Sequence, residues 1–414
     1  MVIKASLRGY WGLAVLLFFL TCCPIARAQN LNTPLDTVRL AYDSFNSLYL
    51  DSLKYIYKSD NRVPEAKNRW NGAVAIWCQP IFWEMSMDAY RREMEIGNAP
   101  QAEEYKRLIR KIFEGNRAHY EGFDFHDANE NTGWFIYDDI MWWTISLARG
   151  YLLTRDSEYL ELSEQSFSRV WYGSSRVGDT GSYDAREGGM FWRWYPIQDP
   201  RPNRSTDGKM ACINFPVVCA ALTLCQTVSP DRRTDSGEAP VHLSRAEYLR
   251  RGIEIYDWGE RNLFDSKSGA VFDSRHGEGA PDRTTHIYNH ATFIGASTLL
   301  YLATGEGRYL RNAKLAADYA TKEMSPGGVL PFEKGIEQGI YTAIFARYMH
   351  LLIYAAGAKE YLPFMRHNAI LGFSHRDPQT GITWGHYDKQ TLQHQVIDSY
   401  TASGIPALLL LFLR

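Results

Sequence analysis

With 414 residues, of which 45% are hydrophobic, the chain can bury two average domains or one large helical or barrel domain. Its 45 Lys and Arg nearly balance its 47 Asp and Glu, and the net charge of −2 argues against a nucleic-acid-binding protein, which needs a basic surface. The 26 Tyr and 12 Trp suit a binding groove walled by aromatic rings.

Residues 1–28 have the three parts of a secretory signal peptide. Lys4 and Arg8 give a charged start, residues 11–20 an apolar segment, and residues 26–28 a small-x-small cleavage site. The apolar segment is too short to span a membrane comfortably. We therefore predict cleavage after residue 28 and export to the periplasm or the extracellular space.

The cysteines point to neither a metal nor a cofactor. Lipoprotein processing at Cys22 or Cys23 is less favoured, because neither follows the small residue that such processing usually wants. The remaining cysteines show no CxxC pair and no Cys/His cluster with zinc spacing. We expect buried free thiols, although an export compartment would permit one disulfide, among Cys78, Cys212, Cys219 and Cys225.

Helical periodicity dominates the chain from residue 37 onward. Apolar residues recur at i, i+3/i+4 in residues 37–58, 77–93 and 102–119, and again from Asp139 onward. Sustained period-2 runs, which would predict strands, are scarce. Residues 407–413 are apolar and too short to cross a bilayer, so they should pack as a closing helix. Long glycine- and proline-containing links occupy residues 173–209, 228–243, 265–290 and 325–340.

A repeat is visible within this helical pattern. The segment from Tyr151 to Tyr159-Leu160 resembles the segment from Tyr301 to Tyr309-Leu310, with threonine at the fourth position of each. Weaker copies of the second-helix start recur at Tyr105, Tyr248 and Tyr361. Helical hairpins repeating at roughly 50–60 residues predict a solenoid or a closed ring. We expect one all-α domain over residues 29–414.

The strongest chemical signal is the adjacent pair Asp138 and Asp139, preceded by Tyr137 and followed by Trp142 and Trp143. Two aspartates can simply cap a helix start, with tryptophans in the core behind them. They can also serve as the two carboxyl groups that flank a glycosidic bond. Adjacent Cα atoms lie ~3.8 Å apart, so carboxyl groups at roughly 5 Å, the spacing of retaining glycosidases, are reachable.

Three further motifs are ambiguous by themselves. Gly188 and Gly189 let a backbone approach a ligand, with Trp192 as a wall, or they form a turn before buried aromatic residues. Lys209 and Asn214, at the start of an apolar helix, favour local hydrogen bonds over a substrate role. His286 and His290 have the i, i+4 spacing of a metal pair but no convincing third ligand, so we predict no metal site.

Taken together, these motifs resemble family 76 of the glycoside hydrolases, the α-1,6-mannanases. The resemblance keeps the family's order over about residues 70–350. It is carried by Tyr137-Asp138-Asp139 with Trp142-Trp143, Gly188-Gly189 with Trp192, Lys209-x-Ala-x-x-Asn214, and Tyr288-Asn289 before Tyr301 and Tyr309-Leu310. Glu187 stands where the family often has a third glycine, and His290-Ala291 where it often has Gln-Gly.

The resemblance implies an (α/α)6 barrel and a retaining endo-α-1,6-mannanase that needs no metal or cofactor. Asp138 would be the nucleophile that forms a covalent glycosyl-enzyme, and Asp139 the acid/base. The implied substrate-binding residues are Tyr137, Trp142, Gly188, Gly189, Trp192, Lys209, Asn214, Tyr288 and Asn289. Alternatives are a transglycosylase, an exo-acting α-mannosidase on cell-wall glycans, or a non-catalytic glycan-binding protein. We expect a monomer whose partner is an α-mannan, with no nucleic-acid or stable protein partner.

Overall fold

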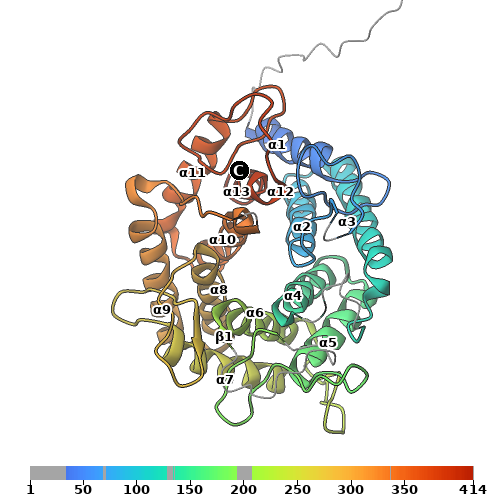
Figure 1. Cartoon of the computed structure of the whole chain (residues 1–414), viewed down its shortest axis with the longest axis vertical. Coiled ribbons are helices and arrows are strands. Elements are labelled where there is room, and N and C mark those ends of the chain that lie inside the picture. The colour runs from blue at the N-terminus through green and yellow to red at the C-terminus, as the bar shows by residue number, and fades with distance from the viewer. Residues whose placement is uncertain are drawn as a thin grey trace, which may run out of the picture.

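The computed structural model describes residues 34–68, 71–127, 134, 136–193, 208–335 and 337–413. Within them, helices alternate between an inner and an outer ring around one axis (Figure 1), which confirms the predicted single-domain (α/α)6 barrel. The inner ring contains α2 (Gln79–Glu95), α4 (Tyr137–Thr154), α6 (Ala211–Thr227), α8 (Ile287–Thr304), α10 (Tyr341–His350) and α13 (Gly404–Phe412). The outer ring contains α1 (Pro34–Tyr49), α3 (Ala99–His119), α5 (Ser157–Tyr172), α7 (Arg245–Leu263), α9 (Gly307–Asp318) and α11 (Leu362–Ser374).

Short elements complete the described residues. Strands β1 (Gly208–Met210) and β2 (Ser274–His276) form one antiparallel ladder, in which Lys209 pairs with Arg275. The remaining helical segments are η1 (Glu121–Phe123), η3 (Tyr319–Glu323), η4 (Pro326–Gly328), η5 (Glu337–Ile340), η6 (Leu351–Ala355), η7 (Lys359–Tyr361) and α12 (Ser399–Ala402). None of the described helices is long and apolar enough to cross a membrane. The predicted signal peptide, residues 1–28, lies outside the described residues.

Composition separates the two rings. Nearly every residue of α6, α8 and α13 is buried, because an inner helix is surrounded by protein on all sides. The outer helices are amphipathic and bury one stripe. The predicted closing helix is confirmed as α13, which packs on both α10 and α2 and so completes the inner ring.

The two copies of the repeat have the same local structure. Thr154 bonds the carbonyl of Gly150 at 2.8 Å and accepts from the N–H of Asp156 at 3.3 Å. Thr304 makes the same two contacts, with Leu300 and Glu306. In each copy the threonine ends an inner helix and orients the turn that starts the next outer helix.

The repeated tyrosines are buried and link successive outer helices. Tyr105 of α3 donates its hydroxyl to Asp43 of α1 at 3.2 Å. Tyr248 of α7 donates to Glu164 of α5 at 3.3 Å, and Tyr361 of η7 lies 2.9 Å from a carboxylate oxygen of α9. The recurrence of Tyr along the chain therefore marks the contact that holds each hairpin against the one before it.

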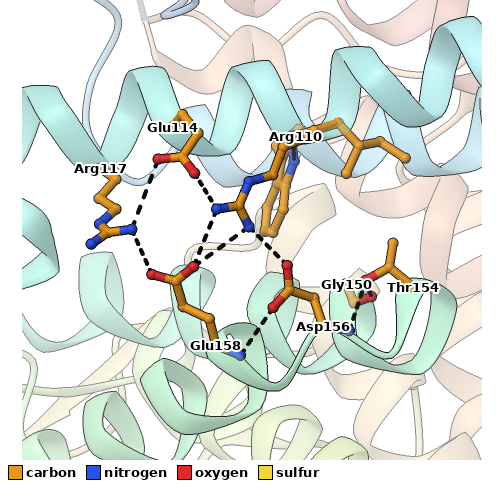
Figure 2. A network of polar contacts seen from close by, with 9 residues as sticks. Arg110, Glu114, Arg117, Gly150, Thr154, Asp156 and Glu158 are labelled. Carbon is orange, nitrogen blue, oxygen red and sulfur yellow. Dashed lines mark hydrogen bonds and ion pairs between the residues drawn. The ribbon is translucent and has the colours of Figure 1, made fainter.

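Ion pairs add a second link between α3 and α5 (Figure 2). Arg110 of α3 lies 2.8 Å from Asp156, and Arg117 lies 2.7 Å from Glu158. Asp156 also caps α5, since its side chain accepts the N–H of Glu158 at 3.1 Å. Because these side chains are partly exposed, each pair contributes only ~0.2–1 kcal/mol, and they orient the helices more than they stabilise them.

Two local expectations were wrong. The helix predicted over residues 37–58 ends at Tyr49, because Asp51 accepts backbone N–H groups of residues 53 and 54 and Leu50 pairs with Tyr57. An aspartate that bonds nearby backbone N–H groups offers the chain an alternative to the helix. The β1–β2 ladder lies where we expected only links, and its three-residue strands are too short to show a period-2 pattern.

Candidate active site

A pocket of about 300 Å³ lies at one end of the inner ring, where the inner helices begin. Because an outer helix returns the chain between successive inner helices, the inner helices run in the same direction and their N-termini converge there. Residues at or just before the starts of α2, α4, α6, α8 and α10 line the pocket. Helix N-termini carry partial positive charge and orphan N–H groups, so this end of the barrel favours anionic side chains.

Asp138 and Asp139 occupy the first turn of α4 and both line the pocket. They are 9% and 6% exposed. The residue before the helix, Ile136, has an extended backbone and pairs with Arg193, while the N–H of Tyr137 donates to the carbonyl of Trp192 at 3.0 Å. The start of α4 is thus held by the segment that carries Trp192.

Asp138 is a buried carboxyl group with side-chain donors around it. The indole N–H of Trp192 donates to its Oδ1 at 2.9 Å, and Cys212 lines the same pocket. Burial raises the pKa of Asp138 to about 7, hydrogen bonds from Cys212 and Trp192 oppose that rise, and the charge of Glu337 adds to it. Burial also keeps the pKa of the Cys212 thiol well above its usual range, so the thiol stays a protonated donor.

Glu337, at the start of η5, is a third carboxyl group in the pocket. Its Oε2 accepts the indole N–H of Trp77 at 2.8 Å, across 260 residues of sequence. The ring of Trp77 lies 6.1 Å from that of Trp142, which is buried behind it. The tryptophan that follows the aspartate pair therefore supports the ring that holds Glu337.

The wall contributed by α8 and α10 is a pair of stacked tyrosines. The rings of Tyr288 and Tyr341 lie 3.9 Å apart and nearly parallel, and both line the pocket. Just before them, His286 lies 3.1 Å from Glu333, and that hydrogen bond raises the pKa of the imidazole. Stacked, buried rings of this kind form a rigid apolar face beside the carboxylates.

This arrangement has what hydrolysis of a glycosidic bond requires. Two carboxyl groups lie at adjacent positions in the sequence. The pKa of Asp138 is raised to about 7, so the pair can take up or release a proton near neutral pH. Aromatic rings and a further carboxylate surround them and can hold a sugar ring and its hydroxyl groups. In the part of the chain that the structure describes, no group of three or more His, Cys, Asp or Glu is placed to hold a metal ion.

The sequence matches the model of glycosyl hydrolase family 76 over residues 42–400. This chain belongs to glycosyl hydrolase family 76. It is accordingly a glycoside hydrolase. No curated protein matches the chain significantly.

Several solved structures share the fold. One of them is an inactive variant of the α-1,6-mannanase GH76A of Salegentibacter sp. HEL1_6, in which two neighbouring aspartates are changed to asparagine, in complex with α-1,6-mannotriose. It is 23% identical to this chain, the match covers 92% of this chain and 99% of that chain, and the TM-score is 0.72. The Lin0763 protein from Listeria innocua is 21% identical, with 91% and 96% covered and a TM-score of 0.71. The family 76 mannosidase Bt3792 from Bacteroides thetaiotaomicron VPI-5482 is 16% identical, with 91% and 97% covered and a TM-score of 0.68.

The pocket around the aspartate pair contains only some of the residues that we singled out as substrate-binding. Trp192 and Tyr288 line the pocket with the aspartate pair. Tyr137 and Trp142 do not line it. Tyr137 is fully buried and donates its hydroxyl to Asp179, a residue that is also paired with the buried Arg169.

The side chains of the two predicted asparagines bond to other parts of the protein. Asn214 accepts the N–H of Met190 at 2.8 Å and donates to its carbonyl at 3.1 Å. Asn289 donates to Asp273 at 3.2 Å. Neither asparagine lines the pocket. Asn214 instead attaches the segment before Trp192 to α6, which agrees with the hydrogen-bonding role favoured from the sequence.

Gly188, Gly189 and Lys209 lie around a second, larger pocket of about 430 Å³, here the outer pocket, whose walls include Phe191, Lys209, Trp258, Arg261, Asn262 and Arg275. A Cβ added to Gly189 would lie 2.5 Å from the Trp258 ring, and the φ angle there is +77°. Lys209 donates to Asp184 at 2.6 Å and to the carbonyl of Gly188 at 2.7 Å. The predicted glycine motif therefore packs against an outer helix, and not against the aspartate pair.

Sequence reasoning missed Trp77, Cys212, Glu337 and Tyr341. Glu337 falls in the long link 325–340, whose length was a functional signal, but nothing local distinguishes this glutamate from its neighbours. Cys212 lies between Lys209 and Asn214 and was predicted only as a buried thiol. All four cysteines are free, and the predicted burial is confirmed for Cys78, Cys212 and Cys219, whereas Cys225 is half-buried.

His290 has a structural role in the described residues. Its Nδ1–H donates to the carbonyl of His286 at 2.9 Å, and its Nε2 accepts the N–H of Val271 at 3.0 Å. Burial lowers the pKa of His290 to about 4, so the ring stays neutral. Both nitrogens are used in fixing the 264–271 turn against α8, which accounts for the i, i+4 histidine pair without a metal.

Proposed function

We propose that this family 76 enzyme cleaves α-1,6-linked mannan internally, with retention of the anomeric configuration. The observation that supports it most directly is the adjacent pair Asp138 and Asp139 on the first turn of α4, buried in a pocket of about 300 Å³. Adjacent positions favour the short carboxyl separation, about 5–5.5 Å, of retaining glycosidases over the ~6.5–9.5 Å of inverting ones.

In the proposed mechanism Asp138 attacks the anomeric carbon while Asp139 protonates the leaving oxygen. Asp139 then removes a proton from the incoming water, which releases the sugar from Asp138. The hydrogen bonds from Trp192 and Cys212 support this division of roles, because donors to Asp138 favour its ionised form. These donors offset part of the effect of burial on Asp138 and stabilise the carboxylate that attacks the sugar.

The α-1,6-mannan assignment is supported by the structural relatives. In the Salegentibacter enzyme, an α-1,6-mannanase, a variant with two neighbouring aspartates replaced is inactive and was captured with α-1,6-mannotriose. Our chain has the same kind of pair at the start of an inner helix. The Tyr288–Tyr341 stack and the Trp77 ring supply the flat faces on which a mannose ring can rest.

The test is product analysis with debranched α-1,6-mannan. A ladder of short oligosaccharides that is absent for Asp139→Asn supports internal hydrolysis. Release of mannose alone would identify an exo-acting enzyme, and products longer than the substrate would identify a transglycosylase. An NMR time course in which the first product has the inverted anomeric configuration would overturn the retaining mechanism.

We also propose that the enzyme is exported and acts as a monomer. The support for export is the charged, apolar and small-residue pattern of residues 1–28. Expression of the full chain with N-terminal sequencing of the exported protein should give Gln29 as the first residue. An uncleaved N-terminus would contradict export by a signal peptide. Light scattering should give the mass of one chain, and the mass of a dimer would contradict the proposed monomer.

A further inference from the structure

We propose that the outer pocket is an accessory glycan-binding site that takes a second stretch of the mannan chain, outside the catalytic pocket. The inference rests on the proposed function. The outer pocket has a volume of about 430 Å³, which exceeds that of the catalytic pocket. It lies against the outer helix α7 and strand β2, neither of which contributes to the catalytic pocket.

The two pockets are opposite sides of one thin wall. Phe191 and Lys209 face the outer pocket, whereas the next residues, Trp192 and Met210, face the catalytic pocket. The N–H of Trp192 donates to the carbonyl of Gly208 at 3.0 Å, so the two segments run side by side. Side chains of extended segments alternate between two faces, and here each face lines a pocket. A glycan that leaves one pocket over this wall enters the other.

The floor of the outer pocket is formed before any ligand binds. Lys209 is fixed by Asp184 and by the carbonyl of Gly188, and its ammonium group lies 5.0 and 5.4 Å from the ring centres of Phe191 and Trp258. Burial acts to raise the pKa of Asp184, but the hydrogen bond and charge of Lys209 and the backbone N–H groups of Arg186 and Glu187 together lower it, so this carboxylate stays charged. A pre-organised floor reduces the entropy lost on binding.

The chemistry of the walls fits a neutral polyhydroxyl ligand. Among the described residues, Arg186, Glu187, Arg261 and Glu278 line this pocket without forming an ion pair. Within the described part of the chain, Arg275 donates to the Asn262 amide and to one backbone carbonyl, and its buried Nε has no partner there. Cations and carboxylates that do not neutralise each other offer both donors and acceptors, as sugar hydroxyl groups require. An anion site would instead present one sign of charge.

The proposal is tested by chain-length dependence of binding. In an Asp138→Asn, Asp139→Asn background, the dissociation constants of mannobiose and mannohexaose are measured by calorimetry. To this we add Arg261→Ala with Glu278→Ala, two exposed side chains that form no hydrogen bond or ion pair with the other described residues. The matched control, Arg107→Ala with Glu104→Ala, changes the same charges on exposed positions of α3.

We expect the pocket variant to lose at least ten-fold in affinity for mannohexaose, so that most of the advantage of the longer chain disappears. The control variant should keep that advantage. Unchanged mannohexaose affinity in the pocket variant would overturn the proposal while leaving the proposed function intact. If the proposed function is wrong, the wild-type enzyme will not cleave mannan and neither oligosaccharide will bind to any variant. That result would overturn both proposals.

Discussion

The indole N–H of Trp192 donates to Oδ1 of Asp138 at 2.9 Å, across 54 residues of sequence. The same tryptophan accepts the N–H of Tyr137 through its carbonyl, one residue before the aspartate. A single residue outside α4 therefore fixes both the start of the helix and the orientation of its first carboxylate. The properties of the aspartate pair consequently depend on a contact that no local pattern specifies.

Asp138→Asn and Asp139→Asn should each lower kcat on α-1,6-mannan by at least about 1,000-fold, because an amide can neither attack the anomeric carbon nor exchange a proton. Far-UV circular dichroism should show that both variants fold. Asp388→Asn, an exposed aspartate, is the control and should keep wild-type activity. Substantial turnover by either active-site variant would contradict the assigned roles.

Trp192→Phe and Glu337→Gln should shift the acid limb of the pH profile of kcat/KM in opposite directions. Loss of the Trp192 donor removes a contact that lowers the pKa of Asp138, whereas loss of the Glu337 charge removes one that raises it. The midpoint of the limb, near 7 in the wild type, should therefore rise in the first variant and fall in the second. Profiles that move together, or not at all, would show that these contacts do not tune the pair.

Asp138→Asn should also make the fold more stable at neutral pH. The pKa of Asp138 rises from 3.8 in the unfolded chain to about 7 in the folded protein, because burial disfavours the charged form. The folded state then binds more protons between these values, so wild-type stability falls as pH increases through this window. Asparagine has no such dependence.

The measurement is the difference in Tm between the wild type and Asp138→Asn. It should be small at pH 4, grow toward pH 7 and reach roughly 2–5 °C above that. Glu84, whose pKa burial raises to about 7, titrates in the same range but is present in both proteins and cancels in the difference. A difference that shrinks with rising pH would contradict the buried, raised carboxyl group.

Gly189→Ala should destabilise the protein by about 2–4 kcal/mol, since backbone strain and a steric clash with the Trp258 ring add together. Gly305→Ala is the matched control, because φ there is also positive, at +75°, but no atom lies within 4 Å of the added Cβ. It should cost only about 1 kcal/mol from the left-handed backbone. Denaturant unfolding measures both, and equal losses would rule out the clash with Trp258.

Treatment with EDTA should leave activity unchanged, because the proposed chemistry uses only carboxyl groups and water. Activity is measured before and after dialysis against the chelator. Loss of activity that a divalent cation restores would show that a metal takes part.

The helical fold class and the adjacent aspartate pair could both be read from local patterns in the sequence. Helical periodicity and the recurring tyrosines are local signals, because a helix repeats every 3.6 residues and each hairpin repeats the same contact with its predecessor. Asp138 and Asp139 are likewise neighbours in the chain, so their proximity needs no tertiary information. The end of the first helix was mispredicted because Asp51 accepts nearby backbone N–H groups. These contacts compete with continuation of the helix, and the apolar periodicity does not reveal them.

The surroundings of that pair depend on contacts between segments that are far apart in the sequence. Trp77 and Glu337 meet across 260 residues, and they do so because closure of the inner ring brings the starts of α2 and α10 to the same end of the barrel. The placement of Lys209 and Trp192 in different pockets follows from alternation along two extended segments that pair through a backbone hydrogen bond. Such contacts depend on how the rings pack, and a linear pattern of residue types does not contain that information.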